Sequence, residues 1–214
     1  MELVMKYTCV VWDFNGTIFD DVNAGIVSTN KMLKERGIPT IPSVEYYKEV
    51  FDFPIKEYYR VLGFDFEREP YEVLAPIWVD LYNENAESAG LCPGVAETME
   101  RIHEMGIRQV IISACEINML EHYLAKLGVR KYLDDVVGLD NIHAGGKLGL
   151  ARDWKAKNGD ERLIMIGDTE HDSETAACLM ADCVLYAGGH HSRARLERHG
   201  HPVIDDIREL IKYL

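Results

Sequence analysis

The chain has 214 residues, of which 47% are apolar and 28% charged, a composition typical of a globular protein with a full hydrophobic core. Its formal net charge of −13 argues against a nucleic-acid partner, because phosphate backbones require a basic protein surface. No apolar run approaches the roughly 20 residues of a membrane-spanning helix, so we expect no membrane partner. The five cysteines form no CxxC pair, which favours free thiols and a cytoplasmic location.

Short apolar runs rich in Val and Ile alternate with helical patterns along most of the chain. These runs do not alternate polar with apolar residues, which is typical of strands buried on both faces of a parallel sheet. The predicted strands are 8–12, 108–112, 136–139, 163–166 and 183–187. Helices are predicted at 95–105 and 117–127, each followed by a glycine in a C-cap position. The pattern predicts an α/β fold with a doubly wound parallel sheet, a Rossmann-like core.

The region 20–91 carries no convincing buried strand and reads as helices separated by turn signals. The predicted helices are 22–36, 43–50, 55–62 and 71–89. A helical cap inserted after the first strand accounts for this break. We therefore expect an α/β catalytic core, 1–19 and 92–214, and a helical cap, 20–91. Within the core, 205–214 is predicted to form a terminal amphipathic helix that packs on the sheet.

Three predicted strands run into a small or acidic polar residue: Asp13, Ser113 and Asp168. Ligands bind at the carboxyl ends of the strands in an open parallel sheet, so these side chains are expected at one edge. Singly, an Asp in such a place is more often a turn or helix-cap residue; the coincidence of three indicates a site. Gly16 and Thr17 follow Asp13 in a segment suited to a tight turn around phosphate oxygens.

Two further residues complete the predicted site. Asp172 follows Asp168 at a strand-to-helix turn, and with Asp13 these carboxylates suit Mg²⁺, which prefers oxygen ligands. Lys147 precedes the fourth predicted strand and supplies a cation for the Asp13 carboxylate and an incoming phosphate.

Together these segments resemble the motifs of the haloacid dehalogenase superfamily, and the insert resembles its phosphoglycolate-phosphatase-like branch with a helical cap. The matching motifs are Asp13 to Thr17, Ser113, Lys147, and Gly167 to Asp172. The resemblance implies a phosphatase, a phosphoric monoester hydrolase, that acts on a small phosphorylated metabolite. Asp13 would form an aspartyl-phosphate, Thr17 and Ser113 would bind phosphoryl oxygens, and Lys147 would hold Asp13 and the phosphate together.

The same resemblance implies a magnesium site. Its ligands would be the Asp13 carboxylate, the backbone carbonyl of Asn15, and Asp168, with Asp172 as a further or outer carboxylate. The expected partners are the small metabolite and, at most, a second copy of the chain, giving a monomer or homodimer.

Asn15 departs from the family pattern, in which phosphatases usually carry a second, acid–base Asp two residues after the nucleophile. An amide can donate a hydrogen bond but cannot deliver or accept a proton at neutral pH. One interpretation is a phosphatase with a good leaving group or another acid–base residue: His171, Glu170, Asp20 or Asp21. The others are a slow phosphatase with a persistent aspartyl-phosphate, or a silent phosphate- and magnesium-binding sensor or interaction protein. A dehalogenase also lacks this Asp but needs no metal-binding carboxylate pair.

Features outside the motifs are interpreted as mainly structural. The aromatic residues of the insert, at helical spacing, are predicted to pack between cap helices. Lys56 and Arg60 are the candidates there for choosing the substrate. His190 and His191 lie in a Gly-rich loop that is predicted to be solvated.

Overall fold

The computed structural model describes residues 6–140, 146–159 and 161–214. Within them, six parallel strands form one sheet in the order β3-β2-β1-β4-β5-β6. The strands are β1 (Cys9–Trp12), β2 (Arg108–Glu116), β3 (Asp135–Leu139), β4 (Leu163–Gly167), β5 (Asp182–Tyr186) and β6 (Val203–Ile204). The chain runs outward from β1 to β3 and resumes at β4, so the topological switch point lies between β1 and β4. Ligands bind at such a point in open α/β sheets.

The doubly wound α/β fold is confirmed, and four of the five predicted strands are found within one residue of their expected bounds. The exception is β2, which continues through Ser113 to Glu116. Its register with β3 shifts between Ile112 and Glu116, so Ser113 lies in an irregular stretch and not beyond the strand. The short strand β6 was not predicted.

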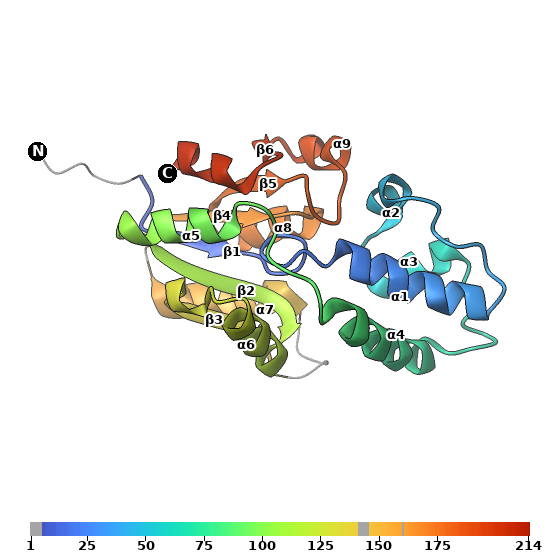
Figure 1. Cartoon of the computed structure of the whole chain (residues 1–214). Coiled ribbons are helices and arrows are strands. Elements are labelled where there is room, and N and C mark those ends of the chain that lie inside the picture. The colour runs from blue at the N-terminus through green and yellow to red at the C-terminus, as the bar shows by residue number, and fades with distance from the viewer. Residues whose placement is uncertain (1–5, 141–145, 160) are drawn as a thin grey trace, which may run out of the picture.

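Helices cover both faces of the sheet, as Figure 1 shows. One face carries α5 (Val95–Glu104), α6 (Ile117–Lys126) and the 3₁₀ helix η3 (Ile207–Tyr213); the other carries α7 (Gly146–Asn158), α8 (Glu170–Leu179) and α9 (Arg193–Leu196). Short 3₁₀ turns complete the core at η1 (Arg130–Tyr132) and η2 (Glu197–His199). Side chains of β1 alternate between the two layers, with Val10 and Trp12 on the first face and Cys9 and Val11 on the second. The terminal helix predicted at 205–214 is therefore η3, which packs on the sheet as expected.

The inserted cap consists of four helices that lie together at one side of the core (Figure 1). They are α1 (Val22–Glu35), α2 (Val44–Val50), α3 (Ile55–Leu62) and α4 (Tyr71–Ala86). The cap has a hydrophobic cluster of its own, separate from the two clusters that line the sheet. Among the described residues, no helix is both long and apolar enough to cross a membrane.

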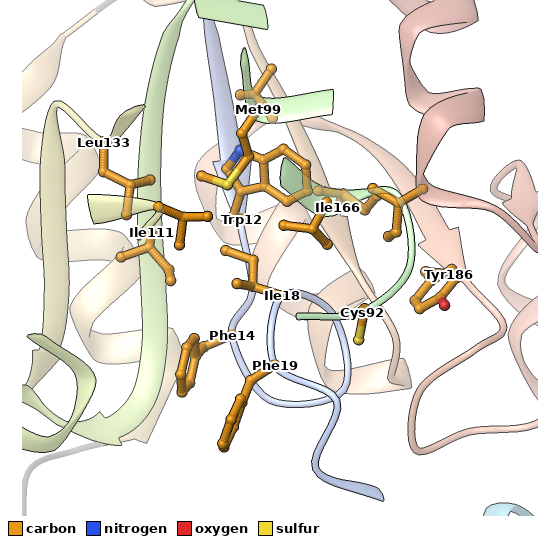
Figure 2. Close-up of a cluster of buried hydrophobic side chains, with 14 of the residues drawn as sticks. Trp12, Phe14, Ile18, Phe19, Cys92, Met99, Ile111, Leu133, Ile166 and Tyr186 are labelled. Carbon is orange, nitrogen blue, oxygen red and sulfur yellow. The ribbon is translucent and has the colours of Figure 1, made fainter. Parts of the chain in front are cut away.

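The loop that leaves β1 is held by apolar side chains on both sides (Figure 2). The rings of Phe14 and Phe19 stack with their centroids 5.2 Å apart, and Ile18 is fully buried. Between these anchors Gly16 has a φ of 72°, and a Cβ there would lie 2.4 Å from Oδ2 of Asp168. Only glycine therefore allows the loop to approach Asp168 so closely.

Candidate active site

Asp13 stands at the carboxyl end of β1, at the switch point of the sheet. Its backbone N–H donates to the carbonyl of Ile166 over 2.9 Å, which fixes its position against β4. The Lys147 ammonium, in the first turn of α7, donates to Oδ1 of Asp13 and to Oδ1 of Asp172. All three side chains are buried, so the ammonium bridges two carboxylates away from bulk water. Burial alone would lower the pKa of Lys147, but the two carboxylates raise it above its usual range.

The other two aspartates lie at the end of β4 and in the first turn of α8. Oδ1 of Asp168 accepts from the Thr17 hydroxyl at 2.8 Å, and Oδ2 accepts from the His190 N–H at 2.6 Å. Oδ2 of Asp172 accepts from the Thr169 N–H at 2.9 Å and from the Thr169 hydroxyl at 2.7 Å, a capping box at the start of the helix. Asp172 is therefore held in place by the local backbone at the start of the helix, whereas Asp168 is held by residues from two other loops.

Asp13, Asp168 and Asp172 each present an oxygen within 4.8 Å of the others. Burial, with the nearby Asp172 charge, raises the pKa of Asp168 to about 6 despite the opposing charge of His190. Burial and the same neighbour raise the pKa of Asp13 well above its usual range, although Lys147 opposes this. The cluster thus holds more negative charge than one lysine balances. An oxygen-donor set with surplus negative charge is what Mg²⁺ requires, so these residues fit that ion.

The two predicted phosphate-binding hydroxyls are placed differently. Ser113 lines the cavity, and its Oγ accepts from the Cys115 N–H at 3.1 Å, which leaves its own hydrogen free to donate. Thr17 is fully buried, its hydroxyl is committed to Asp168, and its N–H donates to the Phe14 carbonyl at 3.2 Å. In this arrangement Thr17 orients Asp168. Its contact with phosphate stays a prediction.

The Asn15 side chain belongs to a buried network at the junction of core and cap. Its Nδ2 donates to Oδ2 of Asp21 at 2.8 Å and to the Tyr82 hydroxyl at 2.9 Å. Tyr82 in turn donates to the same oxygen of Asp21 at 2.6 Å. Because an ionised carboxylate only accepts hydrogen bonds, the amide nitrogen must face Asp21. Both N–H groups of Asn15 are thereby used.

His190 and His191 are buried, so the prediction that they lie in a solvated loop was wrong. Nε2 of His190 lies 3.3 Å from Oδ1 of Asp21, and its Nδ1 lies 2.8 Å from the Tyr47 hydroxyl on α2. Burial works to lower the pKa of His190, but the Asp21 carboxylate raises it to about 9. The loop is buried because α2 packs on it, a contact that its local composition does not reveal.

Among the four residues proposed to replace the missing acid–base group, Asp21 and His171 line the cavity. Glu170 is engaged by Arg195 at 3.0 Å, and Asp20 is exposed. Neither of these two is among the cavity-lining residues. Burial would raise the pKa of Asp21, but His190, Tyr82 and Asn15 together lower it, so this carboxylate is held ionised.

A cavity of about 280 Å³ opens over Asp13, between core and cap. Its core side includes Asp13, Ser113 and Lys147, and its cap side is mainly aromatic. The candidates Lys56 and Arg60 are not among the residues that line it. They lie instead on the outer side of α3, where both contact the ring of Phe66.

The fold and this site bring a buried carboxylate, Asp13, beside a lysine and a candidate metal centre at the switch point of a parallel sheet. Residues 10–185 match the model of the haloacid dehalogenase-like hydrolase family, and the chain belongs to that family. It is 25% identical over 211 residues to phosphoglycolate phosphatase of Pseudomonas syringae pv. tomato, covering 94% of this chain and 78% of that protein. It is 29% identical over 136 residues to mouse phosphoserine phosphatase, covering 56% of this chain and 60% of that one.

A solved structure shows the same fold along nearly the whole chain. It is a haloacid dehalogenase-like hydrolase from Streptococcus pneumoniae, with a TM-score of 0.82 and 18% identity, covering 97% of this chain and 98% of that one. The recognition of the superfamily, and of its phosphoglycolate-phosphatase-like branch, is therefore confirmed.

Proposed function

We propose that this hydrolase is a magnesium-dependent phosphatase that acts on a small phosphorylated metabolite through an aspartyl-phosphate on Asp13. The observation that carries the proposal is the Asp13 carboxylate, which faces the cavity at the switch point of the sheet while Lys147 bridges it to Asp172. The phosphoglycolate and phosphoserine phosphatases among its relatives support the enzyme class.

In the first step an oxygen of Asp13 attacks phosphorus, the phosphorus–ester bond breaks, and its electron pair leaves with the ester oxygen. Lys147 offsets the negative charge of both the nucleophile and the phosphate, and the Ser113 hydroxyl donates to a phosphoryl oxygen. Mg²⁺, held by the Asp13 carboxylate, the Asn15 carbonyl and Asp168, with Asp172 as a further or outer carboxylate, would supply electrostatic stabilisation of the transferring group. In the second step water attacks phosphorus and Asp13 is released.

Proton transfer is the step for which this site differs from its family. Asn15 cannot act as an acid, and Asp21 beside it is held ionised, so no protonated carboxyl is poised at the leaving oxygen in this arrangement. Asp21 is also a poor base for the second step, because its oxygens already accept hydrogen bonds from Gly16, Asn15 and Tyr82 and its pKa is lowered. His171, which lines the cavity, is the remaining candidate to accept a proton from water.

The nucleophile is tested by Asp13→Asn and Asp13→Ala. Either change should abolish phosphoryl-enzyme formation and turnover with Mg²⁺, because the amide and the methyl group are not nucleophiles at phosphorus. Circular dichroism should show an intact fold. Asp20→Asn is the matched control, since Asp20 is exposed and off the cavity. Turnover by either Asp13 variant above a small fraction of wild type removes Asp13 from this role.

The alternative, a catalytically silent phosphate- and magnesium-binding protein, is favoured by one observation: both N–H groups of Asn15 are committed to Asp21 and Tyr82. Under this alternative inorganic phosphate binds in the presence of Mg²⁺, but neither p-nitrophenyl phosphate nor acetyl phosphate yields a phospho-enzyme. Calorimetry and rapid quench together separate the two functions.

A further inference from the structure

The wall of the cavity opposite Asp13 is apolar and aromatic. The rings of Phe51 and Tyr58 meet edge to face at 5.2 Å, and Trp78 stacks on Tyr82 at 4.8 Å. These four line the cavity with Phe53, and Met119 of α6 adds an apolar side chain from the core. The sequence pattern predicted that the aromatic residues of the insert pack between cap helices; several of them also line the cavity that contains Asp13.

The basic side chains along the cavity wall already have carboxylate partners. Lys147 bridges Asp13 and Asp172, and His190 lies against Asp21. The remaining histidine, His171, has its Nδ1 3.0 Å from Glu174. No arginine is among the described residues that line this cavity.

This charge pattern disfavours a substrate with a carboxylate near its phosphate. A carboxylate buried against aromatic rings, without a cation or several donors, loses its hydration without compensation, at a cost of several kcal/mol. An uncharged apolar group gains free energy in the same place, because it removes apolar surface from water.

The size of the cavity limits the organic group. A cavity of about 150 Å³ accepts benzene, so about 280 Å³ has room for a phosphate and one ring. It leaves little room for a peptide backbone. The neutral amide of Asn83 at the exposed end of the lining is the remaining polar group of α4.

The leaving-group chemistry points the same way. The N–H groups of Asn15 are directed to Asp21 and Tyr82, so the ester oxygen departs without a proton from this side chain. An alkoxide is a poor leaving group under these conditions. A phenolate is stabilised by its ring and leaves far more readily.

We infer that the substrate is a small aryl phosphate, a monoester in which a single aromatic ring carries the phosphate, bound with its ring against the cap aromatics. This rests on the proposed function. The Asp13 oxygen bonds to phosphorus, the bond from phosphorus to the aryl oxygen breaks, and the phenolate takes a proton from solvent. Water then cleaves the aspartyl-phosphate, so an aryl phosphate and water give a phenol and inorganic phosphate.

Two non-hydrolysable analogues test binding apart from leaving-group reactivity. Benzylphosphonate mimics phenyl phosphate, and 3-phosphonopropionate mimics phosphoglycolate, with a methylene in place of the ester oxygen in each. With Mg²⁺ present, calorimetry should give a Kd about 10- to 100-fold lower for benzylphosphonate, from burial of the ring. An equal or lower Kd for 3-phosphonopropionate overturns the inference.

The ring contact is tested by Phe51→Ala, with Phe51→Leu as a second variant in case the first does not fold. Either substitution should raise the Kd for benzylphosphonate several-fold and leave the Kd for 3-phosphonopropionate unchanged. Tyr46→Ala is the control, because Tyr46 lies on the same chain segment, is 41% exposed and is not among the lining residues. The ring site is contradicted if Phe51→Ala raises the Kd of both analogues equally, or if Tyr46→Ala raises the Kd for benzylphosphonate as much as Phe51→Ala does.

Turnover measurements distinguish a small aryl phosphate from a phosphotyrosyl peptide as the substrate. Phenyl phosphate should be hydrolysed with a kcat/KM at least 100-fold above that of phosphoglycolate, and a phosphotyrosyl peptide should be a poor substrate. A preference for the peptide would overturn the small-molecule assignment. If acetyl phosphate forms the phospho-enzyme but the analogues rank in the reverse order, this inference fails and the proposed function stands. If benzylphosphonate binds but no ester yields a phospho-enzyme, the proposed function fails and the ring site remains.

Discussion

Asn15 is the residue at which we expect a single substitution to change proton transfer in ester cleavage. Asn15→Asp places a second carboxyl where the amide now lies 2.8 Å from Asp21. Two carboxyl groups at such a short distance share a proton. This raises the pKa of one of them and keeps an acid available near neutral pH. We expect hydrolysis of alkyl phosphates to rise by about 10-fold or more, within the range of a positioned general acid.

The same variant should change the first step with p-nitrophenyl phosphate much less, because that leaving group hardly needs a proton. It should also shorten the life of the aspartyl-phosphate. Steady-state rates on both substrate types, with rapid-quench measurement of the phospho-enzyme, distinguish the two effects. Unchanged or slower alkyl-phosphate hydrolysis would show that another residue, with His171 the first to examine, already transfers the proton.

The two carboxylates after β4 differ in what else they hold. Asp172 caps α8 and pairs with Lys147, whereas Asp168 is bound by Thr17 and the backbone of His190. Asp168→Asn should therefore raise the Mg²⁺ concentration for half-maximal activity about 10-fold or more, and more than Asp172→Asn does. Asp172→Asn should instead lower the free energy of unfolding by about 1–3 kcal/mol, because an amide N–H would face Lys147.

Magnesium titration of activity, and urea unfolding in the presence of EDTA, measure the two effects independently. Equal shifts in magnesium dependence would place both carboxylates on the ion. No shift in either variant would remove the metal site.

At the level of elements, Arg195 of α9 joins the core to the cap. Its guanidinium donates to the carbonyls of Glu49 and Phe51 at 3.2 and 2.7 Å, and to Glu170 at 3.0 Å. The planar guanidinium of arginine has several N–H donors and can reach all of these acceptors at once, whereas the single ammonium of lysine cannot. Arg195→Lys should lower the free energy of unfolding by about 2 kcal/mol and speed amide hydrogen exchange in α2.

The matched control for this contact is Arg193→Lys, two residues away on the same short helix. The Arg193 side chain is 40% exposed and pairs with Glu197 and Asp205 at the surface. We expect a change within about 0.5 kcal/mol for the control. Equal loss of stability in both variants, or unchanged exchange in α2 of Arg195→Lys, would show that Arg195 does not hold the cap.

The strands and most helices could be predicted because their signals are local. Apolar runs gave four strands to within one residue, and Gly106 and Gly128 adopt the positive φ of helix C-caps where they were expected. Strand β6 escaped prediction because two residues carry no periodicity. The continuation of β2 past Ser113 depends on a register shift against β3, which is a property of the pair of strands and not of one segment.

The residues of the candidate site that lie at strand ends could be predicted from the sequence. The contacts that the cap makes with them could not. Asp13, Ser113 and Asp168 follow from the parallel sheet, and Lys147 joins them as the resemblance implied. The partners of Asn15 come from α4 and from the start of the cap, and His190 lies 143 residues from the tyrosine that it contacts. No local pattern in a single sequence encodes such contacts. The roles of these residues in catalysis remain predictions.

On the scale of the whole molecule, the net charge of −13 opposes the approach of any phosphate ester. The cavity counters this locally with Lys147, His190 and the candidate cation site, all at its core end. Among the described residues, its cap end offers mainly apolar rings, and its charged side chain, Asp21, lies against His190. Under the proposed function, a substrate would be oriented by polarity, with its phosphate toward the sheet and its organic group toward the cap.

The stability of the whole molecule should fall in mild acid, and His191 provides a specific reason. The side chain is fully buried, and its Nδ1 accepts from the Glu170 N–H at 3.1 Å, so the ring is neutral with its proton on Nε2. Nε2 has no hydrogen-bond partner among the described residues. Burial, and then the charge of Arg195, lower the pKa of His191 from 6.5 to about 4.

The sign of the effect follows from proton binding. Between pH 6.5 and 4 the unfolded chain binds a proton at this histidine and the folded chain does not, so protons favour unfolding over this range. The free energy of unfolding is therefore not reduced by this histidine above pH 6.5, and it falls as the pH is lowered from 6.5 toward about 4. At about 1.4 kcal/mol for each pKa unit, the loss amounts to about 3 kcal/mol.

His191→Asn keeps an acceptor for the Glu170 N–H and removes the titrating ring. Its absolute stability should be lower because ring volume is lost, but that loss is independent of pH. The measurement is therefore the slope of the free energy of unfolding from pH 6.5 to 4, from urea titrations in EDTA. We expect a shallower slope in His191→Asn than in wild type, and a wild-type slope in His122→Asn, whose histidine is exposed on α6. Parallel curves for His191→Asn and wild type would show that His191 is protonated in the folded protein as readily as in the unfolded chain.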